Sequence, residues 1–160
     1  MELIDHTDIV IREAAASDLD AVAAMLRNLG RHVGAEPKVT AGDLAAFGPL
    51  GRRHFEILVA EAEGGVAGIV LYSIVFSAWR GRPGIFVSDL FVVDTARGRG
   101  LGTRLLRAAI AREAPRDCAF LKLDVDRENK TGIGFYERLG FKIAASDHTM
   151  VLEIDNTKAE

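Results

Sequence analysis

The stretch "DTARGRGLGTRLL", residues 94–106, decides the fold, because a glycine-rich turn runs directly into an apolar helical pattern. A β-rich segment precedes the turn. A helix N-terminus carries unpaired N–H groups and partial positive charge, and glycine lets an anion approach that backbone closely. Arginine adds charge and forked hydrogen bonds. The stretch therefore predicts an anion site of the phosphate type, built on Gly98, Gly100 and Gly102 with Arg97 and Arg99 beside them.

Two better-known phosphate loops do not match this stretch. A P-loop requires a lysine after its last glycine, and no lysine follows here. A dinucleotide fingerprint requires G-x-G-x-x-G, whereas these glycines are spaced G-x-G-x-G, with Thr103 where the third glycine would fall. One alternative stays open, namely a tight turn between a strand and a helix with solvated arginines.

The rest of the chain alternates short strands and helices. Helices are predicted at 17–30, 40–48, 100–114 and 131–139, and strands at 9–13, 55–63, 66–76, 85–93, 119–126, 141–144 and 148–154. The capping boxes Ser17/Asp20 and Thr40/Asp43 open the first two helices, and Gly30 ends the first. Gly64–Gly65 predicts a hairpin turn, and 77–84 is predicted as a loop. The apolar face of the third helix comprises Leu101, Leu105, Leu106, Ala109 and Ile110.

The order strand, helix, strand across 85–126 requires a crossover, and hence a parallel pair. The predicted fold class is therefore α/β (α+β), a mixed and mostly antiparallel sheet with helices on its faces. The length of 160 residues suits one domain with a sizeable core, and a net charge of −3 argues against general nucleic-acid binding. No apolar run approaches the roughly 18 residues that cross a membrane.

The cysteine and histidine residues bear on the location of the protein and on metal binding. The one cysteine, Cys118, cannot form an internal disulfide, and the acidic N-terminus lacks the features of a secretory signal, so a cytoplasmic location is expected. The four histidines are scattered without ligand spacing, so no metal is expected; they are His6, His32, His54 and His148.

Two motifs in this order resemble those of the GNAT superfamily of N-acetyltransferases. Residues 97–102 fit the pattern [QR]-x-x-G-x-[GA], and "NKTGIGFY" resembles N-x-x-[AG]-x-x-F-Y, followed by the Gly140–Phe141 turn. The resemblance covers about 9–154 and implies a single GNAT domain over 1–160. It also implies a parallel strand pair that splays apart and about four flanking helices.

The resemblance implies acetyl-CoA as co-substrate. The pyrophosphate would lie on backbone N–H groups from Arg99 through Leu101 to Thr103, and the pantetheine arm beside the strand at Phe91, Val92 and Val93. Asn129 would bond the cofactor arm beside Phe135, and Tyr136 would protonate the leaving thiolate. The alternative for Tyr136 is an aromatic packed in the core.

One branch, the diamine (spermidine/spermine) acetyltransferases, is similar in a tryptophan-bearing loop, here with Trp79, and in the next strand. Their pattern is aromatic-x-Glu-Asp-x-Phe-Val, and this chain has Ser88 in place of the glutamate, followed by Asp89. A serine cannot pair with an ammonium group, so polyamine preference is in doubt. Asp89 is the expected base, acting through a water, unless it is a structural carboxylate at a β-bulge. Trp79 either closes over the acceptor or forms an interface.

The expected function is acetyl transfer from acetyl-CoA to a primary amine of a small molecule, by direct attack in a ternary complex. Two alternatives stay open, a protein N-terminal or lysine acetyltransferase and a non-catalytic acyl-CoA-binding module. Dimers are common in this family, so the resemblance implies a possible homodimer. Neither nucleic acid nor a membrane is an expected partner.

Overall fold

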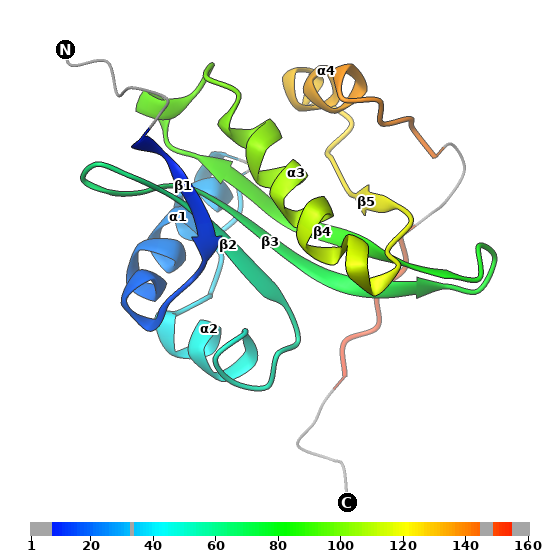
Figure 1. The fold of residues 1–160 in the computed structure, drawn as a ribbon, viewed down its shortest axis with the longest axis horizontal. Helices are drawn as coiled ribbons and strands as arrows, with labels where there is room; N and C mark the ends of the chain where they lie inside the picture. The colour runs from blue at the N-terminus through cyan, green and yellow to red at the C-terminus, as the bar shows by residue number, and fades with distance from the viewer. Residues whose placement is uncertain (1–7, 33, 145–148, 155–160) are drawn as a thin grey trace, which may run out of the picture. The chain divides into compact units, whose positions relative to one another are not determined.

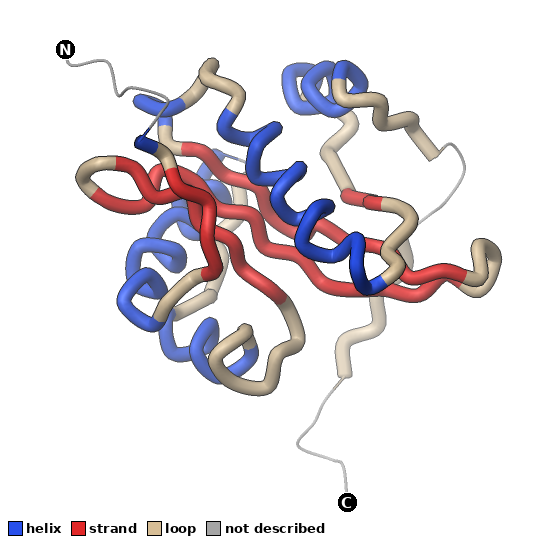
Figure 2. The backbone as a smooth tube through the Cα atoms, in the orientation of Figure 1, coloured by secondary structure: helices blue, strands red, loops and turns tan. Residues whose placement is uncertain are grey.

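The computed structural model describes residues 8–32, 34–144 and 149–154. The chain divides into two compact units, Met1–Asp124 and Val125–Glu160. The first unit holds one sheet in the order β1-β2-β3-β4-β5. Its first four strands pair antiparallel, and β5 pairs parallel to β4 (Figures 1 and 2). The strands are β1 (Val10–Glu13), β2 (Glu56–Ala62), β3 (Gly65–Ser77), β4 (Arg82–Val92) and β5 (Leu121–Leu123). This mixed sheet confirms the predicted fold class.

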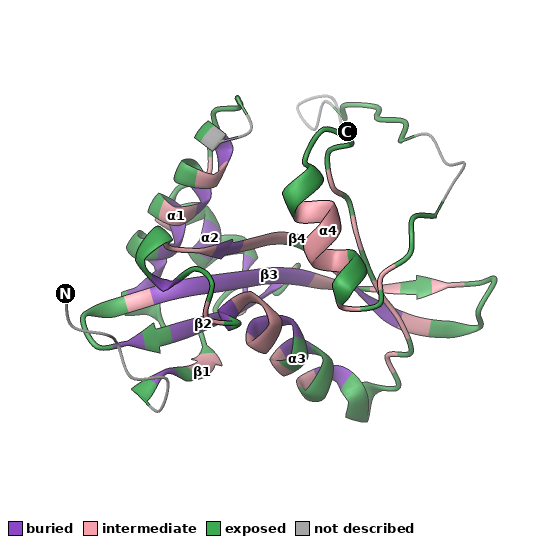
Figure 3. Ribbon diagram, turned by 90° about the horizontal axis from the view of Figure 1, so that it is seen from above, coloured by how far each residue is buried: buried purple, intermediate pink, exposed green. Residues whose placement is uncertain are grey.

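Helices cover both faces of this sheet. Helices α1 (Leu19–His32) and α2 (Ala41–Phe47) lie on one face and α3 (Leu101–Glu113) on the other (Figure 3). Short 3-10 helices span Ala16–Asp18, Asp94–Ala96 and Ala114–Arg116. The buried cluster on the α1 face includes Val22, Val59, Ile69, Leu71 and Phe91. The predicted face of α3 is buried except at Ile110, which is 48% exposed, so its inclusion was wrong.

The start and end of α1 differ from the prediction. Asp18, not Asp20, accepts from the backbone before the helix, since its carboxylate lies 2.7 Å from the Ala15 nitrogen. The helix continues past Gly30 to His32, and Gly34, with φ +73°, is the residue that ends it. Gly30 is required for a different reason, because a Cβ there would lie 2.1 Å from Pro37. The Thr40/Asp43 capping box of α2 is confirmed in both directions.

The predicted loop at 77–84 is largely strand. Strands β3 and β4 continue pairing to Ser77 and Arg82, so only the tip turns, with Gly81 at φ +61°. Strand β2 begins at Glu56, which lies opposite Tyr72 of β3. The five residues of β3 that follow Tyr72 therefore pair with β4 and not with β2. Within the part of the chain that the structure describes, residues 73–77 therefore keep one unpaired edge.

The C-terminal part holds less regular structure than predicted. Strand β5 is three residues long, shorter than the predicted 119–126. In the second unit, α4 (Lys130–Arg138) confirms the last helix. The described residues 141–144 and 149–154 are not strands, and His148 lies outside the described residues. No helix within the described ranges is long and apolar enough to span a membrane.

Candidate active site

The turn between β4 and α3 requires glycine because of its backbone. Gly98 has φ +76° and Gly100 has φ +72°, a left-handed region that strains other residues. A Cβ built on either glycine meets nothing within 4 Å. The two glycines are therefore set by conformation rather than by crowding, and the surface above them is open to an approaching group.

The N-terminus of α3 is not capped by any side chain, and its first turn holds no acidic residue. The first helical bond runs from the Arg104 nitrogen to the Gly100 oxygen at 3.0 Å, which leaves the preceding N–H groups without helical acceptors. Helix α2, in contrast, is closed by the Thr40 hydroxyl and the Asp43 carboxylate. The start of α3 therefore suits an anion supplied from outside the chain.

The flanking arginines are partly committed to the protein itself. The Arg97 Nε donates to the Val92 carbonyl at 3.0 Å, and its Nη1 pairs with Asp94 at 3.0 Å. Arg97 thus holds the turn against the end of β4, while Arg99 is half-buried beside it. That either guanidinium also contacts phosphate stays a prediction.

Beside this turn, the two parallel strands part. Strand β5 pairs with β4 only from Ile85 to Val87, so 88–92 has β3 as its sole paired neighbour in the described sheet. The Val93 N–H donates to the Ala67 carbonyl of β3 at 2.9 Å. Successive N–H groups of a strand point to opposite edges, so the Val92 N–H points to the open edge. Of the stretch 91–93, Val92 is thus the residue whose donor is available there, and the Phe91 side chain is buried in the core.

A β-bulge lies where β5 stops pairing. Leu71 is opposite Asp89 and Tyr72 is opposite Val87, so Ser88 is the extra residue. The Ser88 hydroxyl donates to the Leu71 carbonyl at 3.2 Å. Asp89 is half-buried, and burial raises the pKa of its carboxyl, while a hydrogen bond from Ser88 acts in the opposite direction. The side chain that makes a hydrogen bond across the bulge is therefore that of Ser88, a role that the sequence did not reveal.

In the second unit, Asn129 begins α4. Its Oδ1 accepts from the Gly132 N–H at 2.9 Å, and a Cβ on Gly132 would lie 2.5 Å from the Asn129 amide nitrogen. The oxygen of Asn129 is thus a helix cap, while its amide still carries two N–H donors. The Tyr136 ring packs edge-on against Phe135 and Phe141 at 5.1 and 5.5 Å. Burial raises the Tyr136 pKa, so this phenol keeps its proton at neutral pH.

Comparison with known proteins agrees with this geometry. Residues 24–141 match the model of the "Acetyltransferase (GNAT) family". The chain belongs to the GNAT family of acetyltransferases. It is 30% identical over 140 residues to the thialysine N-epsilon-acetyltransferase of Mus musculus, covering 81% of this chain and 82% of that protein. It is 32% identical over 142 residues to the L-methionine sulfoximine/L-methionine sulfone acetyltransferase of Pseudomonas aeruginosa, covering 84% and 80%.

Solved structures show the same GNAT fold. An acetyltransferase of Trypanosoma brucei aligns with TM-score 0.70 at 26% identity, covering 92% of this chain and 100% of that one. A possible acetyltransferase of Clostridium difficile aligns with TM-score 0.76 at 23% identity, covering 92% and 99%. The chain is therefore a GNAT enzyme, and within the described residues no group of three or more His, Cys, Asp or Glu side chains could hold a metal ion.

Trp79 lies away from the GNAT residues of β4. It is fully exposed at the tip of the β3–β4 hairpin. Arg82, where β4 begins, precedes Asp89 by seven residues, which corresponds to about 23 Å along a strand. The structure therefore does not bring Trp79 and Asp89 together. Arg80 next to it stacks on Phe120, with 4.8 Å between the guanidinium carbon and the ring centroid.

The sequence analysis missed an ionic network on the α3 face. The Tyr72 hydroxyl donates to Glu113 at 2.7 Å, and Arg116 pairs with the other oxygen of Glu113 at 3.0 Å. Both Tyr72 and Glu113 are almost fully buried. Only the placement of a glutamate in the last turn of an apolar helix could have suggested this contact.

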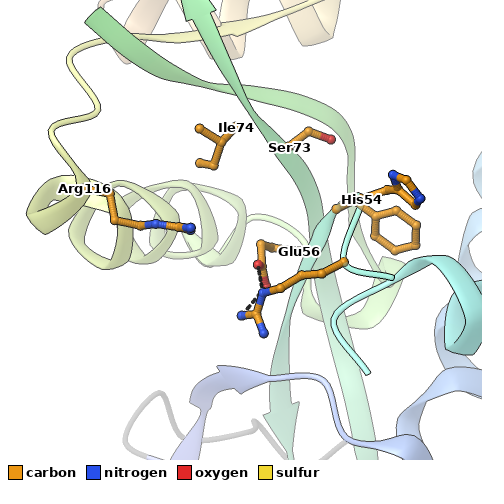
Figure 4. A pocket seen from close by; sticks show the side chains of 7 residues that line it. His54, Glu56, Ser73, Ile74 and Arg116 are labelled. Atoms are coloured by element: carbon orange, nitrogen blue, oxygen red, sulfur yellow. Dashed lines mark hydrogen bonds and ion pairs between the residues drawn. The ribbon is translucent and has the colours of Figure 1, made fainter. Parts of the chain in front are cut away.

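A pocket of about 170 Å³ lies next to this network, where β2 begins and β3 continues alone (Figure 4). His54, Glu56, Ser73, Ile74 and Arg116 line it, and Arg53 pairs with Glu56 at 2.7 Å (Figure 4). Its charged groups have partners within the chain, so we assign it no ligand.

Proposed function

We propose that this GNAT enzyme transfers the acetyl group of acetyl-CoA to a primary amine of a small molecule, by direct attack in a ternary complex. The observation that carries the proposal is the uncapped N-terminus of α3 next to the unpaired edge of β4. An anion and an extended amide chain are the two kinds of group that such surfaces bind. Acetyl-CoA contains both, as its pyrophosphate and its pantetheine arm.

The proposed co-substrate contacts follow from the free donors. The N–H groups of residues 100–103 would hold the pyrophosphate, and the pantetheine arm would lie along the open edge of β4, with the Val92 N–H kept for the acetyl oxygen. From the resemblance to the family, Asn129 would also bond the cofactor arm through its amide group. When bound, acetyl-CoA supplies the activated acetyl group, and the protein orients it.

The proposed acceptor is an amine of amino-acid size rather than a long polyamine. Two relatives are named for thialysine and for methionine sulfoximine, which supports a small acceptor. Ser88 stands where the diamine branch has glutamate, so the chain has one fewer carboxylate to pair with the several ammonium groups of a polyamine. Asp89 would bind the reacting ammonium.

The proposed chemistry uses three groups of this chain. An alkyl ammonium has a pKa of about 10, so Asp89 would first accept a proton from it through a water. The Val92 N–H would stabilise charge that develops on the acetyl oxygen. The Tyr136 phenol would donate its proton to the departing sulfur and recover one, through water, from the nitrogen that becomes the amide; its raised pKa keeps the phenol protonated at neutral pH.

Release of free thiol from acetyl-CoA, followed across a panel of amino acids, short amines, spermidine and an N-terminal peptide, tests this proposal. Turnover with small amines, and none without an amine, is the expected result. Acetyl-CoA binding without turnover on any member would instead favour the non-catalytic alternative. Preference for the peptide would favour the protein acetyltransferase.

We also propose that the enzyme works as a cytoplasmic homodimer, with the free edge of β3 as its interface. Residues 73–77 carry no charge and no proline, the features that usually protect an exposed edge. Phe76 there is 69% exposed. Phe76→Lys should convert the dimer to a monomer in light scattering, whereas Val10→Lys on the outermost strand β1 should not. A wild-type monomer would refute this interface.

A further inference from the structure

Lys122 of β5 is a strand cation that has no carboxylate partner among the described residues. The other two cations of the described strands bind groups of the chain itself, Arg12 the Asp18 carboxylate at 2.7 Å and Arg82 a backbone carbonyl at 3.2 Å. Lys122 is exposed, and its ammonium lies over the Phe86 ring, 5.6 Å from the ring centroid. An ammonium has three N–H donors, so a contact with one ring leaves donors for an anion.

Lys122 and Asp89 lie on the same face of the sheet. Leu71 is opposite Asp89 and belongs to the buried cluster on the α1 face. Two positions further along β3, Ser73 is opposite Phe86, which pairs in turn with Lys122. Residues two apart on a strand share a face, and so do residues paired directly across strands. Asp89 and Lys122 are therefore both on the α1 face.

The same register sets the spacing of the two opposite charges. Two residues along the strand direction and one strand across separate the Cα atoms of Asp89 and Lys122 by about 8 Å. Within the described part of the chain, neither side chain takes part in an ion pair, with the other or with any third residue. The two charges are thus complementary to a small molecule that carries both signs close together.

These two residues also flank the point where β4 and β5 part. Strand β5 stops pairing at Leu123, one residue after Lys122, and Asp89 lies two residues past that point on β4. In the proposed function the Val92 N–H holds the acetyl oxygen further along this open edge. An amine at Asp89 would therefore meet the acetyl group on one side and have Lys122 on the other.

We propose that the acceptor is an α-amino acid, and that Lys122 binds its carboxylate while Asp89 binds its reacting α-ammonium group. The inference rests on the proposed function, in which Asp89 binds the reacting ammonium. An α-amino acid carries its two charges on one carbon, and a charge-assisted hydrogen bond of about 2.7–2.9 Å at each end extends it to the spacing of the two side chains. A simple alkylamine or a polyamine offers no anion to Lys122. Lys122 is thus a residue that determines acceptor specificity.

The test compares the α-amino acid with the highest kcat/KM and the amine that lacks only its carboxyl group. Lys122→Gln should lower kcat/KM for the amino acid about tenfold to a hundredfold, mainly by raising KM, because a hydrogen bond to a charged group is lost. The decarboxylated amine and acetyl-CoA should keep their KM values, and Lys122→Arg should retain the preference for the amino acid. Arg107→Gln removes one positive charge from the exposed side of α3, on the other face of the sheet, and is the control.

Each other result counts against the inference in a recognisable way. Equal or better use of the decarboxylated amine by the wild type, or an unchanged kcat/KM for the amino acid in Lys122→Gln, overturns it and leaves acetyl transfer to small amines standing. A raised KM for acetyl-CoA alone would assign Lys122 to the co-substrate instead. Absence of thiol release with every amine would show that the proposed function itself is wrong.

Discussion

Gly102→Glu is expected to weaken acetyl-CoA binding while making the protein more stable, two effects of opposite sign. Gly102 is the second residue of α3, at a start that has no side-chain cap and no acidic residue. A carboxylate there interacts with the helix dipole by about 0.3–1 kcal/mol, and replacing a helical glycine adds up to about 1 kcal/mol. The melting temperature should therefore rise by a few degrees.

The same carboxylate would occupy the N–H groups that the pyrophosphate needs and would repel its charge. Hydrogen bonds to a charged group are worth about 1.5–3 kcal/mol each. Losing two at the lower value totals about 3 kcal/mol, which is about a hundredfold in Kd. Isothermal titration calorimetry with acetyl-CoA measures this loss, alongside thermal unfolding of the same sample.

The chain offers a matched control in Gly42, the second residue of α2. That helix start is already closed by Thr40, so Gly42→Glu should leave acetyl-CoA affinity unchanged. A Kd within twofold of wild type for Gly102→Glu, in a folded protein, would refute the assignment of the α3 N-terminus. Equal losses in both variants would show that the added charge acts from a distance rather than at the site.

Four further outcomes are expected. Tyr136→Phe should lower kcat about a hundredfold at unchanged acetyl-CoA affinity, in single-turnover experiments where chemistry limits the rate. Ser88→Glu should increase kcat/KM for spermidine relative to short amines, and wild-type preference for spermidine would contradict the acceptor proposal. Tyr72→Phe should cost about 1.5–3 kcal/mol in urea unfolding, because Glu113 loses a buried donor. The hydrogen bond from Arg12 lowers the pKa of Asp18 in the folded protein, so the ionised carboxylate stabilises the fold at pH values above its unfolded pKa. This stabilisation is lost as the pH falls through the lowered folded-state pKa. Asp18→Asn should therefore make the free energy of unfolding less dependent on pH in the acid range, as measured by urea unfolding at several pH values.

Local signals in the sequence were sufficient where the structure depends on neighbouring residues. The Thr40/Asp43 box, the Gly64–Gly65 turn and the glycine turn ahead of α3 each involve residues within a few positions of one another. Backbone conformation and helix capping depend on residues a few positions apart, so the helices, the turns and the order of the motifs could be predicted from the sequence alone. The parallel pairing of β4 and β5 followed from chain connectivity.

The missed features depend on contacts between distant residues. Tyr72 and Glu113 are 41 positions apart, and nothing near either residue signals the other. The segment 77–84 has the composition of a loop, yet pairing between β3 and β4 extends through it to Ser77 and Arg82, because each added pair continues an existing ladder. The bulge at Ser88 likewise needed the register against Leu71 before the hydroxyl could be given a partner.

Asp89 and Tyr136 share a physical feature that distinguishes them from the ionic network on the α3 face. Burial is the largest cause of the pKa shift of each, and it acts upward in both. Glu113, in contrast, is held between Arg116 and the Tyr72 hydroxyl. The ionisations of Asp89 and Tyr136 together predict a bell-shaped dependence of the rate on pH. Activity should rise with pH as Asp89 ionises through its raised pKa and fall again as Tyr136 loses its proton through its own. Because the ordinary pKa of a phenol is several units above that of a carboxyl group, the loss of activity on the alkaline side reports Tyr136 and the loss on the acid side reports Asp89.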